Sequence, residues 1–290
     1  MTESFREEFR VAKFGLQYPF RKPFDSAQWR WPPVIFTIYR IVLPLYVASW
    51  YITLMVITKG RSGIHSSYAY LTIWSYTILL IHLIWAFGVN LVSIWIKRHR
   101  SNSSMSLHID TKDGADNYAF QYDATAETSS GCQNTESVTK SNTWYMKVSW
   151  VLFSNSSVAA IIVTAIYFSA LYSLTGQTHL DPFDFNLHGV NSIIMILEHC
   201  IAGYPIRLLH LIYPLIYGAI YIIFSAIYWS FDHKNNVLYP GVLDWNHPGS
   251  TMLVLCILVF LVVPILQLIF YGIHRLKLWL HLKIHSRPYF

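Results

Sequence analysis

The chain has 290 residues, of which 54% are hydrophobic and only 12% are charged. A soluble protein carries about a quarter charged residues, so this composition excludes an ordinary cytosolic or secreted domain. Most apolar side chains must face lipid or one another within a membrane. The formal net charge is +6, but no basic stripe with interleaved stacking aromatics occurs in a polar region, and we therefore expect no nucleic-acid partner.

Six apolar stretches are long enough, or nearly so, to cross a hydrocarbon core that needs about 20 helical residues. They cover residues 34–57, 70–96, 148–174, 187–202, 208–231 and 251–273. The fourth is short and interrupted by polar groups, so it is the weakest of the six and also the place where a binding site is expected. The prediction is an all-α integral membrane protein, a bundle of six transmembrane helices that contacts membrane lipids.

Three regions follow from this pattern. The N-terminal arm lacks the apolar core of a signal peptide and is expected to remain, either as a short helix on the membrane surface or as a solvated arm. A segment inside the transmembrane domain is rich in Ser, Thr, Asn and Asp and is predicted to be a disordered loop. The boundaries are 1–33 for the arm, 34–273 for the transmembrane domain, 97–147 for the loop and 274–290 for a basic C-terminal tail.

The distribution of Lys and Arg predicts the orientation. Of the 21 Lys and Arg residues, 17 lie in the arm, the 97–147 loop, the connection at Arg207 and the tail. Three lie in the alternate connections, and Arg40 lies inside the first span. Because cytosolic loops carry the excess of Lys and Arg, both termini and the 97–147 loop are predicted to be cytosolic.

Polar side chains line one face of the fourth span. The residues His188, Asn191, Ser192, Met195 and Glu198 are spaced by three or four positions, or by multiples that return to the same face of a helix. This face must look into the bundle, where a seam of interhelical hydrogen bonds is its ordinary role.

Depth within the membrane pairs some of these groups with other spans. Glu198 lies level with Arg40 of the first span, and an ion pair between them would neutralise two expensive charges, which is a structural role. Thr72 and His188 lie near the starts of the second and fourth spans, which both enter from the outer side, so they are predicted at similar depth.

Thr72 and His188 could together supply a nucleophile and a general base. Threonine attacks poorly at its own pKa, whereas histidine can take and return a proton near neutral pH. Asp181 or Asp184 in the preceding loop could orient the imidazole. The alternative is that the two residues serve packing and hydrogen bonding, as isolated polar residues of membrane helices commonly do.

No metal site and no cofactor are predicted. His281 and His285 are four apart, as in helical metal-binding pairs, but no Cys or carboxylate supports them. Contact with lipid headgroups is the preferred interpretation of these two residues. The sequence contains no phosphate-cradling glycine loop.

Several strings resemble the rolling stone family of multi-pass membrane proteins. They are HGVNSIIMILE at 188–198, YPIRLLHLIYPLIYGAIYIIFSAIYW at 204–229 and YPGVLDWNHPGS at 239–250, with YLTIWSYTILLIHL at 70–83 as a further match. The family is associated with myoblast fusion in insects. The resemblance therefore implies a role in cell–cell fusion at the plasma membrane, with cell-surface or cytosolic protein partners.

The layout is also similar, more distantly, to the androgen-induced transmembrane hydrolases, which cleave fatty-acid esters of hydroxy fatty acids with an intramembrane Thr and His. Their pattern matches Tyr70-Leu71-Thr72, and His188 followed by Glu198 and Tyr204-Pro205. The residues after His188 and the long 97–147 loop depart from that family. This resemblance implies an alternative function, an intramembrane esterase for a fatty-acid ester substrate.

Overall fold

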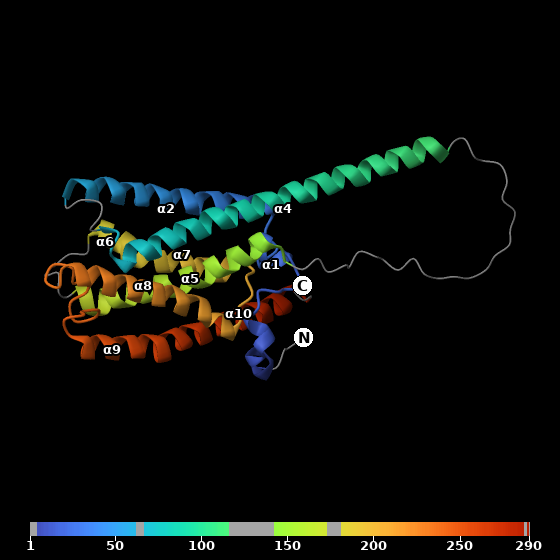
Figure 1. The fold of residues 1–290 in the computed structure, drawn as a ribbon. Coiled ribbons are helices and arrows are strands. Elements are labelled where there is room, and N and C mark those ends of the chain that lie inside the picture. The colour runs from blue at the N-terminus through green and yellow to red at the C-terminus, as the bar shows by residue number, and fades with distance from the viewer. Residues whose placement is uncertain (1–4, 62–66, 116–141, 173–180, 287–288, 290) are drawn as a thin grey trace.

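A computed structural model describes residues 5–61, 67–115, 142–172, 181–286 and 289. Within these residues the protein is helical, and the long helices lie side by side (Figure 1). The predicted all-α class is confirmed. Five helical segments are long and apolar enough to cross a membrane: Pro33–Ile57, Leu71–His99, Trp144–Ala170, Leu208–Phe231 and Pro248–His285.

The helices agree closely with the apolar runs in chain order. Two begin at a proline, Pro33 and Pro248, where the missing backbone N–H costs nothing because the first turn has no partner for it. Short π-helical turns extend α5 or join consecutive helices, as Tyr167–Leu171 (η3), Asn186–Val190 (η5) and Leu258–Val262 (η7). The helices are α1 (Lys22–Asp25), α2 (Pro33–Arg61), α4 (Leu71–Ala115), α5 (Trp144–Ile166), α6 (Pro182–Phe185), α7 (Asn191–Ile201), α8 (Ile212–Phe231), α9 (Pro248–Ile257) and α10 (Val263–His285).

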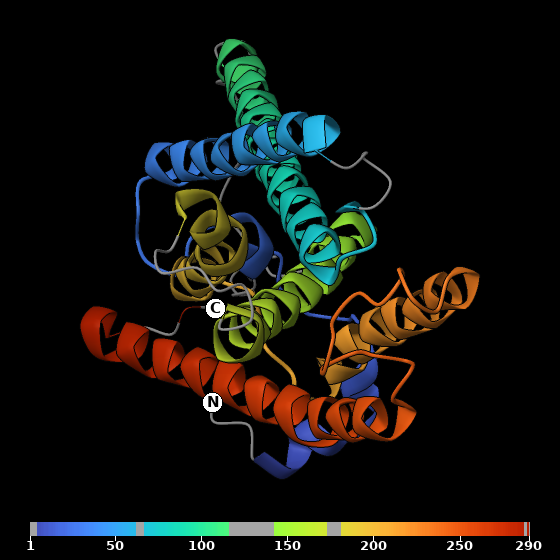
Figure 2. The same cartoon turned by 90° about the vertical axis from the view of Figure 1, so that its left-hand side faces the viewer.

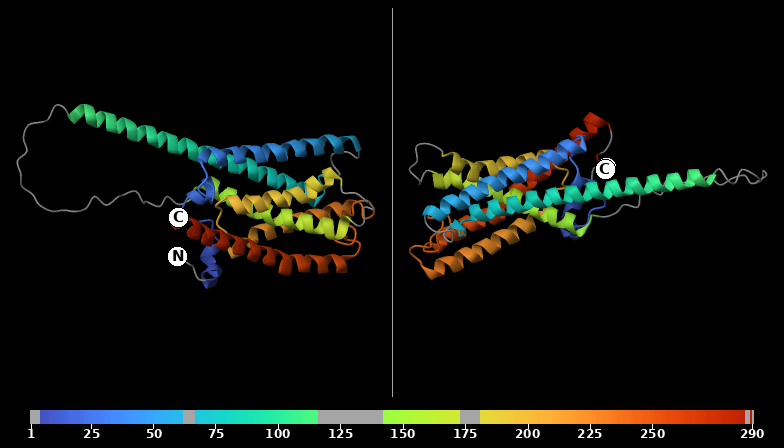
Figure 3. Two further views of the ribbon diagram at one scale, coloured as in Figure 1. Left: turned by 180° about the vertical axis from the view of Figure 1, so that it is seen from behind. Right: turned by 90° about the horizontal axis from the view of Figure 1, so that it is seen from above.

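The fourth predicted span is helical, but it is not among the five segments that are long and apolar enough to cross a membrane. The elements α6, η5 and α7 form continuous helix over residues 182–201. The N-terminal arm, the extension of α4 and the end of α10 lie at one end of the bundle (Figure 3). Neighbouring helices cover the polar face of α7, where Asn191, Met195 and Glu198 are completely buried. This run therefore needs less apolar surface than the others.

Three of the predicted boundaries differ from those of the structure. The helix α4 continues to Ala115, and α5 begins at Trp144, so the predicted 97–147 loop is too long at both ends. Residues 116–141 of that loop lie outside the described residues. The helix α10 continues to His285 through most of the predicted tail. Extending an existing helix adds a hydrogen bond per residue without a new nucleation step, and α10 also buries one face of the extension, at Lys277 and His281.

The helix α5 forms the centre of the bundle, in contact with α4, α7, α8 and α10 (Figure 2). Its Trp150 is almost fully buried and donates a hydrogen bond to the carbonyl of Pro205, at 2.7 Å. Phe153 stacks on Tyr204 with ring centroids 4.5 Å apart. Aromatic packing of this kind contributes beyond the area it buries, so α5 organises the positions of its neighbours.

The N-terminal arm is attached to this centre. Arg207 donates hydrogen bonds to the carbonyls of Gly15 and Gln17, and Asn142 donates one to Leu16. The arm forms two short 3-10 helices, Phe5–Phe9 and Val11–Phe14. It is therefore packed across the end of the bundle, unlike a freely solvated arm.

Candidate functional site

A buried ion pair joins α2 to α7, between the two charged residues that were predicted to lie at the same depth. Nη1 of Arg40 lies 2.9 Å from Oε1 and 2.8 Å from Oε2 of Glu198. The hydroxyl of Tyr39 donates a hydrogen bond to Oε1, at 2.6 Å. Because both charges are buried, each is tolerated only through the other. The cluster holds α2 against α7.

The histidine beside this pair, His82 of α4, is missed in the sequence analysis. Its Nε2 lies 3.5 Å from Oε2 of Glu198. The signal was present, because His82 follows Thr72 by ten residues just as Glu198 follows His188. The depth argument that places Thr72 level with His188 therefore also places His82 of α4 level with Glu198 of α7.

The polar face of α7 meets α5 in a seam of hydrogen bonds. The hydroxyl of Thr164 lies 2.6 Å from the hydroxyl of Ser192 and 3.2 Å from Oδ1 of Asn191, and it also contacts the backbone carbonyl of His188. Ser192 also donates to the carbonyl of Ala160, at 2.9 Å. Thr164 lies in an apolar run that carries no sign of its partners. The arrangement is the interhelical hydrogen-bond seam that is the ordinary role of this face.

Thr72 and His188 face separate neighbours. The imidazole of His188 stacks on the ring of Tyr167, with centroids 3.6 Å apart and planes 2° from parallel. Its Nδ1 is buried without a hydrogen-bond partner among the described residues. Thr72 lies in the wall of a cavity that His188 does not line. In this part of the chain no hydrogen bond joins the two side chains, and a nucleophile and its base need one.

Asp184 does not orient His188 in this arrangement. Its carboxylate interacts with the hydroxyl of Tyr167. Among the described ion pairs, none joins Asp184 to His188. Thr72, His188 and Asp184, which is one of the two carboxylates predicted to orient the imidazole, are therefore not assembled in this conformation.

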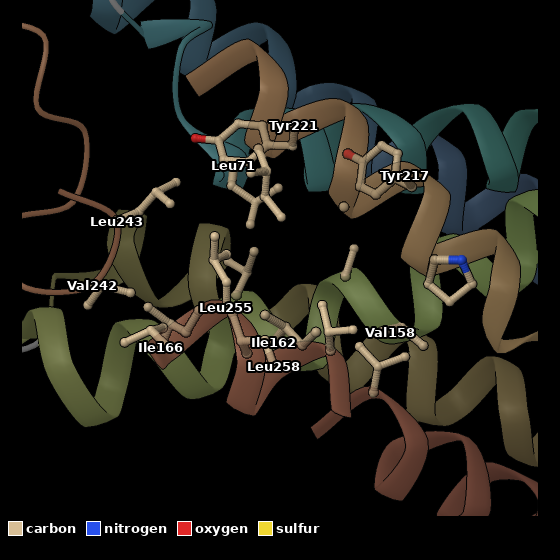
Figure 4. Close-up of a pocket in the computed structure, with 18 of the residues that line it drawn as sticks. Leu71, Val158, Ile162, Ile166, Tyr217, Tyr221, Val242, Leu243, Leu255 and Leu258 are labelled. Carbon is tan, nitrogen blue, oxygen red and sulfur yellow. The ribbon is translucent and has the colours of Figure 1, made fainter. Parts of the chain in front are cut away.

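The cavity at Thr72 has a volume of about 310 Å³ and lies between α4, α5, α8, α9 and η7. Figure 4 shows Tyr217 and Tyr221 on one wall, facing Ile162 and Leu258 across the open space. Apart from a few hydroxyl groups, the lining side chains are hydrocarbon. The cavity is therefore suited to an apolar ligand.

The loop between α8 and α9 closes one end of this cavity. The hydroxyl of Tyr239 accepts a hydrogen bond from the backbone N–H of Leu71, at 2.7 Å, and Tyr221 donates one to the carbonyl of Ala69, at 2.9 Å. Burial raises the pKa of Tyr239, so its hydroxyl stays neutral and can donate. The start of α4 is thereby joined to the loop.

In the described part of the chain, no group of three His, Cys, Asp or Glu side chains could hold a metal ion. The predicted contact of His281 with lipid headgroups is wrong. His281 is buried and stacks on Trp29, with centroids 6.5 Å apart. Its role here is packing between α10 and the N-terminal arm.

Comparison with known proteins agrees with the strings quoted above. Residues 119–286 match the family model described as Protein rolling stone. The Protein rolling stone of Drosophila melanogaster is 25% identical over 282 residues, which cover 95% of this chain and 90% of that protein. No solved structure matches the chain. Since the family model covers more than half of its length, this protein belongs to the rolling stone family.

Proposed function

We propose that the protein acts at the plasma membrane in cell–cell fusion and that it does so without ester hydrolysis. Membership of the rolling stone family supports the first half, because the family is associated with myoblast fusion. The observation that carries the second half is the separation of Thr72 from His188, whose ring packs on Tyr167. Protein partners at the surfaces of the fusing cells are part of the proposal.

The proposal includes six membrane crossings with both termini in the cytosol. The position of the N-terminal arm and the end of α10 at the same end of the bundle, and the excess of Lys and Arg in the segments at that end, support it. The loop over residues 232–247 then faces the outside of the cell. Hydrogen bonds hold this loop in a defined shape, including those from Asn235 to Asp232 and from Trp245 to Ser225. Such a loop offers a preformed surface to a partner on the opposing cell.

Depletion and rescue in fusing muscle precursor cells test both halves. We expect depletion to lower the fraction of nuclei in multinucleate cells severalfold, and wild type, Thr72→Ala and His188→Ala to restore it equally. Surface delivery of each variant is measured in parallel. Normal fusion after depletion would remove the fusion role. Loss of rescue by Thr72→Ala at normal surface level would contradict the non-enzymatic half.

One observation favours the alternative, an intramembrane lipid esterase. Thr72 lines an apolar cavity, which is where a lipid ester would have to lie. For hydrolysis His188 would have to leave Tyr167 and approach Thr72. A fluorophosphonate probe separates the two functions, because only the esterase predicts labelling that Thr72→Ala and His188→Ala both abolish.

A further inference from the structure

The shape of the cavity at Thr72 is that of a channel along the helix axes. On α8 the lining residues run from Pro214 to Ile222, which corresponds to about 12 Å at 1.5 Å per residue. On α5 and the start of η3 they run from Val158 to Tyr167. Its volume of about 310 Å³ lies at the lower end of the range of about 300–1,000 Å³ for ligand sites. Water would find few polar partners along such a wall.

The cavity is not fully enclosed, and part of its wall is formed by α8 and the α9–η7 segment. The outer faces of both are exposed, with Ile223 on α8 at 60% and Phe260 on η7 at 76%. In a membrane these outer faces would contact lipid, and an acyl chain of a neighbouring lipid could enter between the two helices.

Hydroxyl groups gather near one end of the channel. Tyr217 lies one helical turn from Tyr221, towards the end of the bundle that holds the termini. Tyr221 donates to the carbonyl of Ala69, three residues before Thr72. Tyr217 and Thr72 both line the cavity and lie close along the chain to the two residues that this hydrogen bond joins.

The hydroxyl of Tyr217 is buried and has no hydrogen-bond partner among the described residues. A buried donor of this kind requires an acceptor. The lining of the cavity includes Thr72 and Tyr239, which also carry hydroxyls, and no charged side chain. An acceptor placed here must be uncharged, because an ionised group would find no counter-charge.

We propose that this cavity binds one acyl chain of a neutral acylglycerol. The uncharged ester or alcohol oxygen lies between Tyr217 and Thr72, and Tyr217 donates a hydrogen bond to it. The chain runs along the hydrocarbon wall past Ile162 and Val158. The binding requires neither fusion activity nor hydrolysis, so it is tested separately from both.

The experiment uses the purified full chain with a photoactivatable alkyne monoacylglycerol as the probe. We expect the label on peptides of α5 and α8, and unlabelled monoacylglycerol should compete for it. The variant Gly218→Leu fills the channel, because Gly218 lines it and an added Cβ meets nothing within 4 Å. Labelling should fall about tenfold, as expected for an overfilled apolar site.

The matched control is Gly272→Leu on α10, where an added Cβ also meets nothing within 4 Å but which does not line the cavity. It should label like wild type. Tyr217→Phe removes only the hydroxyl and should lower labelling roughly two- to tenfold, the effect of one hydrogen bond. Thermal unfolding of each variant verifies that it is folded.

Three results would overturn the proposal. The first is equal labelling of Gly218→Leu and Gly272→Leu. The second is a label confined to peptides that do not line the cavity. The third is competition by an ionised fatty acid or a sterol as strong as that by monoacylglycerol, because either would contradict the neutral acylglycerol.

Discussion

The helix α4 and the continuous η5–α7 run each carry two polar residues ten positions apart, and the two cross-helix pairs that these residues could form differ. At one level His82 lies 3.5 Å from Glu198, in a cluster with Arg40. At the other level Thr72 faces a cavity and His188 stacks on Tyr167. A buried charge must have a partner, whereas a threonine or a neutral histidine is accommodated by separate neighbours. Equal depth therefore produces contact only where charge demands it.

Removing the charge of Glu198 should produce the largest effect. In Glu198→Ala the guanidinium of Arg40 remains buried without a partner, and we expect a loss of about 3–5 kcal/mol of stability. Thermal unfolding in detergent measures it. The double variant Arg40→Met with Glu198→Leu should recover most of the loss, since it removes both charges. A loss below about 1 kcal/mol in Glu198→Ala would contradict the charge argument.

The seam between α5 and α7 should rank second. Thr164→Val removes a hydroxyl that bonds to Ser192 and Asn191, and we expect it to cost about 1–2 kcal/mol. The matched control is Thr53→Val, because Thr53 is exposed and bonds only to the carbonyl of Ser49 within its own helix. The control should remain within about 0.5 kcal/mol of wild type. Equal effects of the two would mean that the seam adds no stability.

The stack of His188 on Tyr167 should contribute less. We expect Tyr167→Leu to cost about 1 kcal/mol, the usual worth of an aromatic pair. Phe260→Leu on the exposed face of η7 is the control. If Tyr167→Leu lost as much stability as Glu198→Ala, the surroundings of His188 would matter as much to the fold as the ion pair of Glu198. The contrast between the two pairs would then fail.

The smallest effect concerns the loop that closes the cavity end. A hydrogen bond of 2.9 Å from His247 lowers the pKa of Asp244. A carboxylate with a lowered pKa stabilises the folded state above its unfolded pKa of about 3.9, and this contribution is lost as the pH falls through the folded value. Hydrogen-exchange protection in residues 232–247, measured relative to the intrinsic exchange rate at each pH, should therefore fall only below about pH 4, and Asp244→Asn should flatten this profile. A loss of protection between pH 5 and 7 would assign the effect to another group.

Some of this site could be predicted from residues alone. Arg40 and Glu198 are the two charges inside the predicted spans, so each had an obvious partner once depth was known. The contact of His82 with Glu198 follows from the same depth argument. Thr164 and Tyr217 could not be recognised, because each is a common residue in an apolar run. Their importance depends on which neighbour they face across the bundle.

The sequence by itself determined that this is a helical membrane protein, where its apolar helices lie and which residues share a depth. Helix rise and the thickness of the bilayer are enough for that. Only the tertiary structure decided that α4 runs on to Ala115 and that Thr72 turns towards α8. A helix that is apolar on every side carries no signal of its rotation about its own axis. The side chains that it meets are decided by packing against its neighbours.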